Sequence, residues 1–159
     1  MTQPVTGASR TAQDLEERTH QVARVIGATP EQVYAAFVTP ERLARWWGPK
    51  GFRNTFEACE PRPGGAWRFV MHGPNGADHP NESVFETLIP SERIVIRHAC
   101  GPFYTLTVTL EPEGAATRLT WRQTFDSAKQ FASARRIIVT ANEENLDRLE
   151  AELKGESPP

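Results

Sequence analysis

Residues 127–154, SAKQFASARRIIVTANEENLDRLEAELK, lie in the longest stretch of the chain that lacks both glycine and proline. At about 100° per residue, a helix through this stretch places its large apolar side chains on one stripe. The members of this stripe are Phe131, Ile138, Leu146, Leu149 and Leu153. The pattern predicts one long C-terminal helix that buries the stripe against the rest of the protein.

Two polar residues interrupt the stripe, because Arg135 and Asn142 fall near its centre. A helix that faces a fully packed core rarely carries both, whereas a helix that closes over a cavity accommodates them. Most charged residues fall outside the stripe. Among them, Glu144 with Arg148 and Glu150 with Lys154 have the spacing of ion pairs along a helix surface.

Length and composition limit the class of protein. The 159 residues suggest one domain with a substantial core, and a formal net charge of −2 implies no strong attraction to nucleic acid. No apolar stretch reaches the roughly 20 residues of a membrane-spanning helix, and the first residues do not resemble a signal peptide. The two cysteines, Cys59 and Cys100, form no CxxC pair, so we expect a reduced, cytoplasmic protein without a disulfide.

Local signals divide the chain into a leader, a domain and a tail. Residues 1–18 are polar and predict a disordered leader, with a short helix near 12–18. Residues 19–154 predict a single domain, and 155–159 a disordered tail. A strand is expected at 19–27. The pairs Thr29-Pro30 and Thr39-Pro40 then predict the starts of two short helices. Alternating apolar residues between turn signals predict six further strands, at 52–59, 66–72, 81–89, 93–99, 103–111 and 117–125.

This order of elements predicts the fold class. Strands that follow one another on short connections, with no helix between them, form an antiparallel meander. The sequence therefore predicts an α+β protein, in which an antiparallel sheet of about six to seven strands carries the long C-terminal helix on one side.

Two motifs also resemble a known family. Residues 40–52, PERLARWWGPKGF, and residues 61–74, PRPGGAWRFVMHGP, resemble the signature of the heat-shock-protein-90 ATPase activator homologue family. Residues 90–94 and 117–121 fit the same family, and the resemblance runs from about 19 to 154. That family belongs to the START and birch-pollen-allergen (SRPBCC) superfamily. The resemblance implies a helix-grip fold, with a curved sheet wrapped around the long helix and an apolar cavity between them.

The resemblance implies no reaction and carries over no catalytic residue. Many members have a Gly-Trp pair in about the position of Ala141-Asn142, so their ligand preference is not transferred. The founding member stimulates a chaperone ATPase with an additional domain, for which we expect no room here. A chaperone contact and a homodimer are the further partner expectations.

Strand alternation predicts which side chains face the cavity. The apolar candidates are Trp67, Phe69, Met71, Leu106, Trp121 and Ile138. The polar candidates are His98, Tyr104, Gln123, Arg135 and Asn142. A few polar groups in an apolar cavity orient a small ligand, although each is more readily explained as a half-buried residue with a partner in the fold. We favour Arg135 with Asn142 as the pair for a carboxylate or carbonyl group. We interpret Trp46-Trp47 as a core and lid element.

Metal and acid–base chemistry have little support. The cluster His72, Asp78 and His79 matches no zinc spacing, so we expect no metal and no cofactor. Four strand glutamates are candidate general acids or bases, but a polar strand face explains them as well: Glu57, Glu60, Glu82 and Glu86. No glycine-rich phosphate loop is present.

The sequence is compatible with three functions, each from a different class of protein. The first is a module that binds a small apolar or amphipathic molecule in the cavity. The second is an enzyme that uses the cavity for cyclisation, dehydration or hydrolysis, which convergent titratable side chains with shifted pKa values would favour. The third is a chaperone-interaction module, which an exposed apolar patch would favour.

Overall fold

The computed structural model describes residues 7–159, with side chains from residue 11 onward. Its elements are α1 (Gly7–Glu17), β1 (Thr19–Ile26), α2 (Pro30–Val38), α3 (Pro40–Trp46), β2 (Arg53–Cys59), β3 (Gly65–His72), β4 (Asp78–Ile89), β5 (Arg93–His98), β6 (Tyr104–Glu113), β7 (Ala116–Phe125) and α4 (Ala128–Leu153). The predicted strands, short helices and long helix are all present. The leader predicted at 1–18 lies partly outside the described residues, and the short helix predicted within it is α1, which begins at Gly7.

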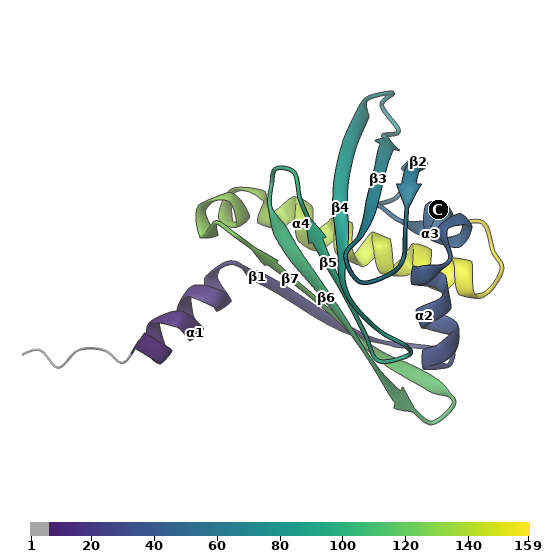
Figure 1. Ribbon diagram of the computed structural model, residues 1–159, viewed down its shortest axis with the longest axis horizontal. Coiled ribbons are helices and arrows are strands. Elements are labelled where there is room, and N and C mark those ends of the chain that lie inside the picture. The colour runs from purple at the N-terminus through teal and green to yellow at the C-terminus, as the bar shows by residue number, and fades with distance from the viewer. Residues whose placement is uncertain (1–6) are drawn as a thin grey trace, which may run out of the picture.

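The strands form one antiparallel sheet in the order β1-β7-β6-β5-β4-β3-β2. Strands β2 to β7 follow each other as the predicted meander, while β1 pairs with β7 at the far edge. Figure 1 shows α4 running across the curved sheet, with α2 and α3 gathered near its C-terminal end. This arrangement is the predicted α+β helix-grip fold.

The helix starts follow the signals in the sequence. Thr29 caps α2 in a capping box, because its Oγ1 accepts from the N–H of Gln32 at 3.2 Å and Gln32 Oε1 accepts from the N–H of Thr29 at 2.9 Å. Ser127 caps α4 by accepting from the N–H of Gln130 at 3.2 Å. These caps fix where α2 and α4 leave the preceding chain.

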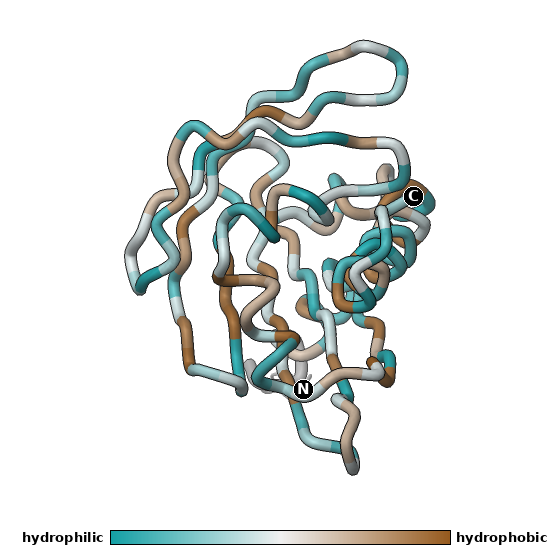
Figure 2. The backbone as a smooth tube through the Cα atoms, turned by 90° about the vertical axis from the view of Figure 1, so that its right-hand side faces the viewer, coloured by the Kyte–Doolittle hydropathy of each residue, from teal (hydrophilic) through white to brown (hydrophobic). Residues whose placement is uncertain are grey.

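The core lies between the sheet and helices α2 to α4, where hydrophobic segments gather, while the outer loops are mostly hydrophilic (Figure 2). Its centre is aromatic. Trp46 is fully buried, packs edge-on against Phe37 at 4.8 Å between ring centroids, and donates from Nε1 to the carbonyl of Ala36. Cys59 and Cys100 are free thiols. Among the helices of the described residues, none is long and apolar enough to cross a membrane.

Arg24 of β1 fastens α4 to the sheet edge. Its guanidinium donates to Asp147 Oδ1 at 2.7 Å and to Glu143 Oε2 at 2.7 Å, and it reaches Glu150 Oε1 at 3.3 Å. Neither ion pair predicted along the helix surface forms within the described residues. Glu150 turns to Arg24 because a partner on another element lies within reach.

A buried arginine holds the other end of α4. The helical pattern placed Arg148 outside the apolar stripe, but Arg148 is only 3% exposed. The guanidinium donates to the carbonyl oxygens of Arg45 (3.2 Å), Trp46 (3.0 Å) and Pro49 (3.1 Å). The end of α3 and the loop after it are therefore tied to α4 through one side chain.

The C-terminal tail, predicted to be disordered, returns to the same place. The backbone oxygen of Pro159 accepts from Arg148 Nη1 at 2.9 Å and from the N–H of Gly51 at 3.3 Å. Gly51 has φ of 84°, a left-handed conformation that favours glycine. The tail is thus hydrogen-bonded to the loop that joins α3 to β2.

Candidate functional site

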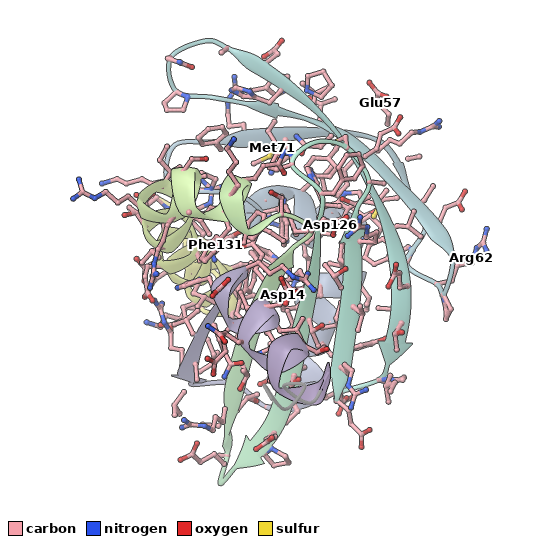
Figure 3. The ribbon with its side chains drawn as sticks, turned by 90° about the vertical axis from the view of Figure 1, so that its left-hand side faces the viewer. Asp14, Glu57, Arg62, Met71, Asp126 and Phe131 are labelled. Atoms are coloured by element: carbon pink, nitrogen blue, oxygen red, sulfur yellow. The ribbon has the colours of Figure 1, made fainter. Side chains whose placement is uncertain are left out.

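A cavity of about 150 Å³ lies between the sheet, α4 and the loop after α3. The sheet contributes Met71, Asn81, Tyr104, Leu106, Trp121 and Gln123 to its wall. Helix α4 contributes Ile137, Ile138, Ala141, Asn142 and Asn145, and the loop contributes Trp47, Gly48 and Pro49. Figure 3 shows Met71 between the sheet and α4, while Glu57 and Arg62 point outward from the strands and their turn.

The structure places most of the predicted residues at this cavity and some elsewhere. Met71, Tyr104, Leu106, Trp121, Gln123, Ile138 and Asn142 line it. Trp67 and Phe69 face the same side of the sheet but belong to the packed core, where their rings stack at 4.4 Å between centroids. Strand alternation identified the inward face correctly, but it carries no information about position along the core.

Arg135 corrects the sequence interpretation, because it is exposed and does not line the cavity. Its guanidinium lies 5.9 Å from the centroid of the Phe131 ring. The N-terminal half of α4 is largely exposed, whereas the half beyond Asn142 is largely buried. The stripe runs along the whole helix, but only its C-terminal part is buried against the rest of the protein. The predicted carboxylate site of Arg135 with Asn142 is therefore not assembled.

Two amides form the polar part of the wall. Asn142 Nδ2 donates to Gln123 Oε1 at 2.9 Å and to His20 Nδ1 at 2.9 Å. The second contact requires His20 to accept, which suits a neutral ring. Burial lowers the pKa of His20. The negative charge of Glu143 raises this pKa, and the positive charge of Arg135 lowers it further. Within the described residues, Asn142 Oδ1 and Gln123 Nε2 have no partner.

His98 does not line the cavity, but it packs against a residue that does, Tyr104. Its ring stacks on Tyr104 with 4.5 Å between centroids, and Nδ1 donates to the carbonyl of Pro102 at 2.7 Å. Nε2 lies 2.8 Å from Asn81 Oδ1, a contact that favours the protonated ring. Burial is the larger effect and lowers the pKa of His98. Burial also raises the pKa of Tyr104, so both groups favour their neutral forms at pH 7.

The apolar wall is aromatic at one end. Trp47 and Trp121 stack with ring centroids 5.8 Å apart, and Trp46 packs edge-on against Trp47 at 5.6 Å. Trp46 belongs to the core, and Trp47 lines the cavity. The indole N–H of Trp121 has no acceptor among the described residues.

Sequence reasoning missed several lining residues. Asn145 follows Asn142 by three positions, a helical spacing that would have revealed it. Asn145 Nδ2 donates to the carbonyl of Trp46 at 3.3 Å. Asn81 lies on a polar part of β4, and nothing in the local pattern distinguishes it.

The other candidate chemistries lie away from the cavity. In the part of the chain that the structure describes, no group of three or more His, Cys, Asp or Glu side chains is arranged to hold a metal ion. His72 Nδ1 lies 2.7 Å from Asp78 Oδ1, and His72 Nε2 lies 2.7 Å from Thr55 Oγ1. The four strand glutamates are exposed and none lines the cavity: Glu57, Glu60, Glu82 and Glu86.

Comparison with solved structures supports the fold. A protein from Arthrobacter aurescens is 25% identical with a TM-score of 0.81, and the match covers 90% of each chain. A protein from Chromobacterium violaceum is 28% identical with a TM-score of 0.76, covering 84% of this chain and 95% of the other. The AHSA1 protein from Silicibacter pomeroyi is 19% identical with a TM-score of 0.70, covering 86% and 97%, which shows the fold alone.

Comparison at the level of sequence places the chain in a family. None of the curated proteins matches it significantly. The model of one family, described as activator of Hsp90 ATPase homolog 1-like protein, matches residues 27–154. This match spans both motifs noted in the sequence and continues to the end of α4. The chain therefore belongs to the activator of Hsp90 ATPase homolog 1-like (AHSA1) family.

Proposed function

We propose that the protein binds a small, mostly apolar molecule with one neutral hydrogen-bonding group in the cavity between the sheet and α4. The observation that carries the proposal is the amide pair of Gln123 and Asn142. Their mutual hydrogen bond leaves one donor, Gln123 Nε2, and one acceptor, Asn142 Oδ1, without a partner in the described residues. Membership of the AHSA1 family supports a ligand-binding or chaperone-associated module.

The size of the cavity limits the ligand. An apolar protein cavity of this volume, about 150 Å³, is known to hold a molecule of the size of benzene. The stacked indoles of Trp47 and Trp121 favour a planar ring. A primary amide on such a ring offers both an acceptor and a donor, which complements the free groups of Gln123 and Asn142.

The lining also favours a neutral group inside the cavity. None of the described residues that line the cavity is Asp, Glu, Lys, Arg or His. A charged group inside would lose its hydration without gaining a counter-charge, which is strongly unfavourable. Cytoplasmic location is part of the proposal, and the two free thiols support it because a reducing compartment maintains them.

Isothermal titration with benzamide tests the proposal. We expect saturable binding to the wild type and its loss in Ala141→Phe, because residue 141 lines the cavity. Ala132→Phe is the matched control, since Ala132 is exposed on the same helix. Asn142→Leu should weaken benzamide about tenfold while sparing ethylbenzene, the effect of one lost polar contact. Equal binding of benzamide by wild type and Ala141→Phe, or no binding to the wild type, would refute the proposal.

The family match favours one second candidate, a chaperone-interaction module. Its test is the ATPase rate of an Hsp90-type chaperone with and without this protein, and an unchanged rate counts against it. The enzyme alternative has less support in the described residues. Among the described residues that line the cavity, Tyr104 is the one with a titratable side chain, and burial keeps it neutral by raising its pKa.

A further inference from the structure

A second hollow adjoins the cavity on the outer side of α4. It is an open groove of about 440 Å³ between α4 and the loop after α3. Pro49, Ile137 and Ala141 line both the cavity and the groove. The two spaces are therefore neighbours that share these three side chains.

The groove has an apolar floor and a charged rim. Phe52 and Ile137 provide apolar surface, and Ile137 is 75% exposed, the highest value among the large hydrophobic residues described. Such exposure favours an apolar occupant. The rim carries Lys50, Arg136 and Glu144.

The two cations of the rim are available to a ligand. Lys50 and Arg136 are exposed, and neither forms a hydrogen bond or ion pair with another described residue. With one carboxylate, Glu144, against two cations, the rim has an excess of positive charge. The cavity lining, in contrast, carries no formal charge. The two hollows thus complement different parts of a molecule: a neutral ring inside and an anionic end outside.

We propose that the groove binds a carboxylate-bearing apolar tail of the same molecule whose ring occupies the cavity. The ligand is then an aryl amide, or a ring with equivalent hydrogen bonding, that carries a chain ending in a carboxylate. This inference rests on the proposed function and specifies its ligand. The apolar chain covers Ile137, and the carboxylate lies between Lys50 and Arg136.

A series of paired compounds tests the inference. Benzamide is extended in the para position by alkyl chains of increasing length that end in a carboxylic acid, and each acid is compared with the corresponding primary alcohol. At one chain length the acid should bind about two- to fivefold more tightly than the alcohol, the range expected for exposed ion pairs. Added salt should reduce this preference, because exposed charges are screened.

Variants test whether the preference for acids over alcohols arises from the two cations of the groove. The double variant Lys50→Gln with Arg136→Gln should bind acid and alcohol equally while retaining the affinity of the wild type for benzamide. Lys129→Gln, an exposed lysine on the same helix outside the groove, should retain the preference. Equal affinity for acid and alcohol at every length, or a preference that survives in the double variant, overturns the inference.

The outcomes separate the two proposals. Binding of benzamide without any preference for acids overturns the groove and leaves the cavity proposal in place. Binding of the acids without benzamide supports the anionic groove and overturns the cavity ligand. If no compound binds, both fail. Concentration-dependent dimerisation that Ile137→Ser abolishes, with no effect of the acids, would show the groove to be a contact between copies and also overturns the inference.

Discussion

Arg148 Nε donates to the carbonyl oxygen of Trp46 at 3.0 Å, from a helix position between the exposed Asp147 and the fully buried Leu149. The same guanidinium reaches the carbonyls of Arg45 and Pro49. Three backbone acceptors at the end of α3 thus share one buried donor group. Their arrangement makes Arg148 a structural element of the loop that forms part of the cavity wall.

Replacement of Arg148 should be strongly destabilising. We expect Arg148→Ala to lower the free energy of unfolding by about 3 kcal/mol or more, because buried carbonyls left without a donor cost about 1–3 kcal/mol each. Arg148→Lys should recover only part of this, since an ammonium cannot reproduce the planar set of donors. Urea unfolding followed by circular dichroism measures both. Arg136→Ala, on the exposed side of α4, should change stability by less than about 0.5 kcal/mol; a similar loss in both variants would contradict the assigned role.

Glu152 should make stability depend on acidity. Its carboxylate accepts from Arg45 Nη2 at 2.6 Å and from Arg42 Nε at 3.2 Å. Hydrogen bonds from Arg45 lower the pKa of Glu152 below its usual 4.5, although burial acts in the opposite direction. Because the folded-state pKa is lowered, this stabilisation is complete above the unfolded pKa and is lost as the pH falls through the folded pKa.

The measurement is the free energy of unfolding in urea at about pH 6 and about pH 3. Glu152→Gln should cost about 1–2 kcal/mol at the higher pH, and its stability should decline less toward the lower pH. Glu156→Gln is the control, because Glu156 is exposed in the tail. Parallel curves for wild type and Glu152→Gln would show that this carboxylate is not coupled to folding.

His98 should produce a separate decline at milder acidity. Burial lowers its pKa below 6.5, and the hydrogen bond to the Pro102 carbonyl opposes burial. The unfolded chain therefore takes up a proton at a higher pH than the folded one, so stability falls as the pH drops from about 7 to about 5. His20, whose pKa burial also lowers, adds to the decline.

The variant His98→Gln should be less stable than the wild type at pH 7 and should show a smaller loss between pH 7 and pH 5. His79→Gln changes an exposed histidine and should keep the slope of the wild type. Constant stability of the wild type over this range would mean that folding does not lower the pKa of His98. A rise in stability toward pH 5 would mean that the folded ring is already protonated at pH 7, which its contact with Asn81 Oδ1 favours.

The two thiols should differ in reactivity. Burial raises the pKa of Cys59 to about 11, so at pH 8 only about one molecule in a thousand carries the reactive thiolate there. We expect iodoacetamide to modify Cys100 first and to reach Cys59 quickly only at higher pH or in urea. Peptide mass spectrometry over time measures both sites in the same sample. Faster labelling of Cys59 in the folded protein would place its thiol in a more open environment than the structure does.

Most of the fold follows from local signals. Alternation predicted β3 and β5 to β7, and the pairs Thr29-Pro30 and Thr39-Pro40 predicted the starts of α2 and α3. These signals are encoded within a few residues, so they survive without knowledge of the tertiary structure. The inward faces of the strands followed in the same way.

The site depended on contacts that local patterns do not contain. Arg135 and Asn142 share a helix face, yet only Asn142 is covered, because cover depends on where α4 lies over the sheet. Arg148 and Glu152 looked like surface charges, but α3 packs on their side of the helix and buries both. Helical periodicity describes α4 alone, whereas burial of one side of α4 depends on which other element packs against that side.

The pairing of β1 with β7 has a consequence for synthesis of the chain. Thr19 lies opposite Thr124, and their hydroxyl groups are 3.0 Å apart, although 105 positions separate them in sequence. A nascent chain leaves the ribosome from its N-terminus, so β1 emerges long before its partner exists. Val22 and Ile26 must remain unpaired during that interval, available to molecular chaperones or to other nascent chains. Closure of the sheet edge, and with it anchoring of α4 by Arg24, is then a late step in the maturation of the protein.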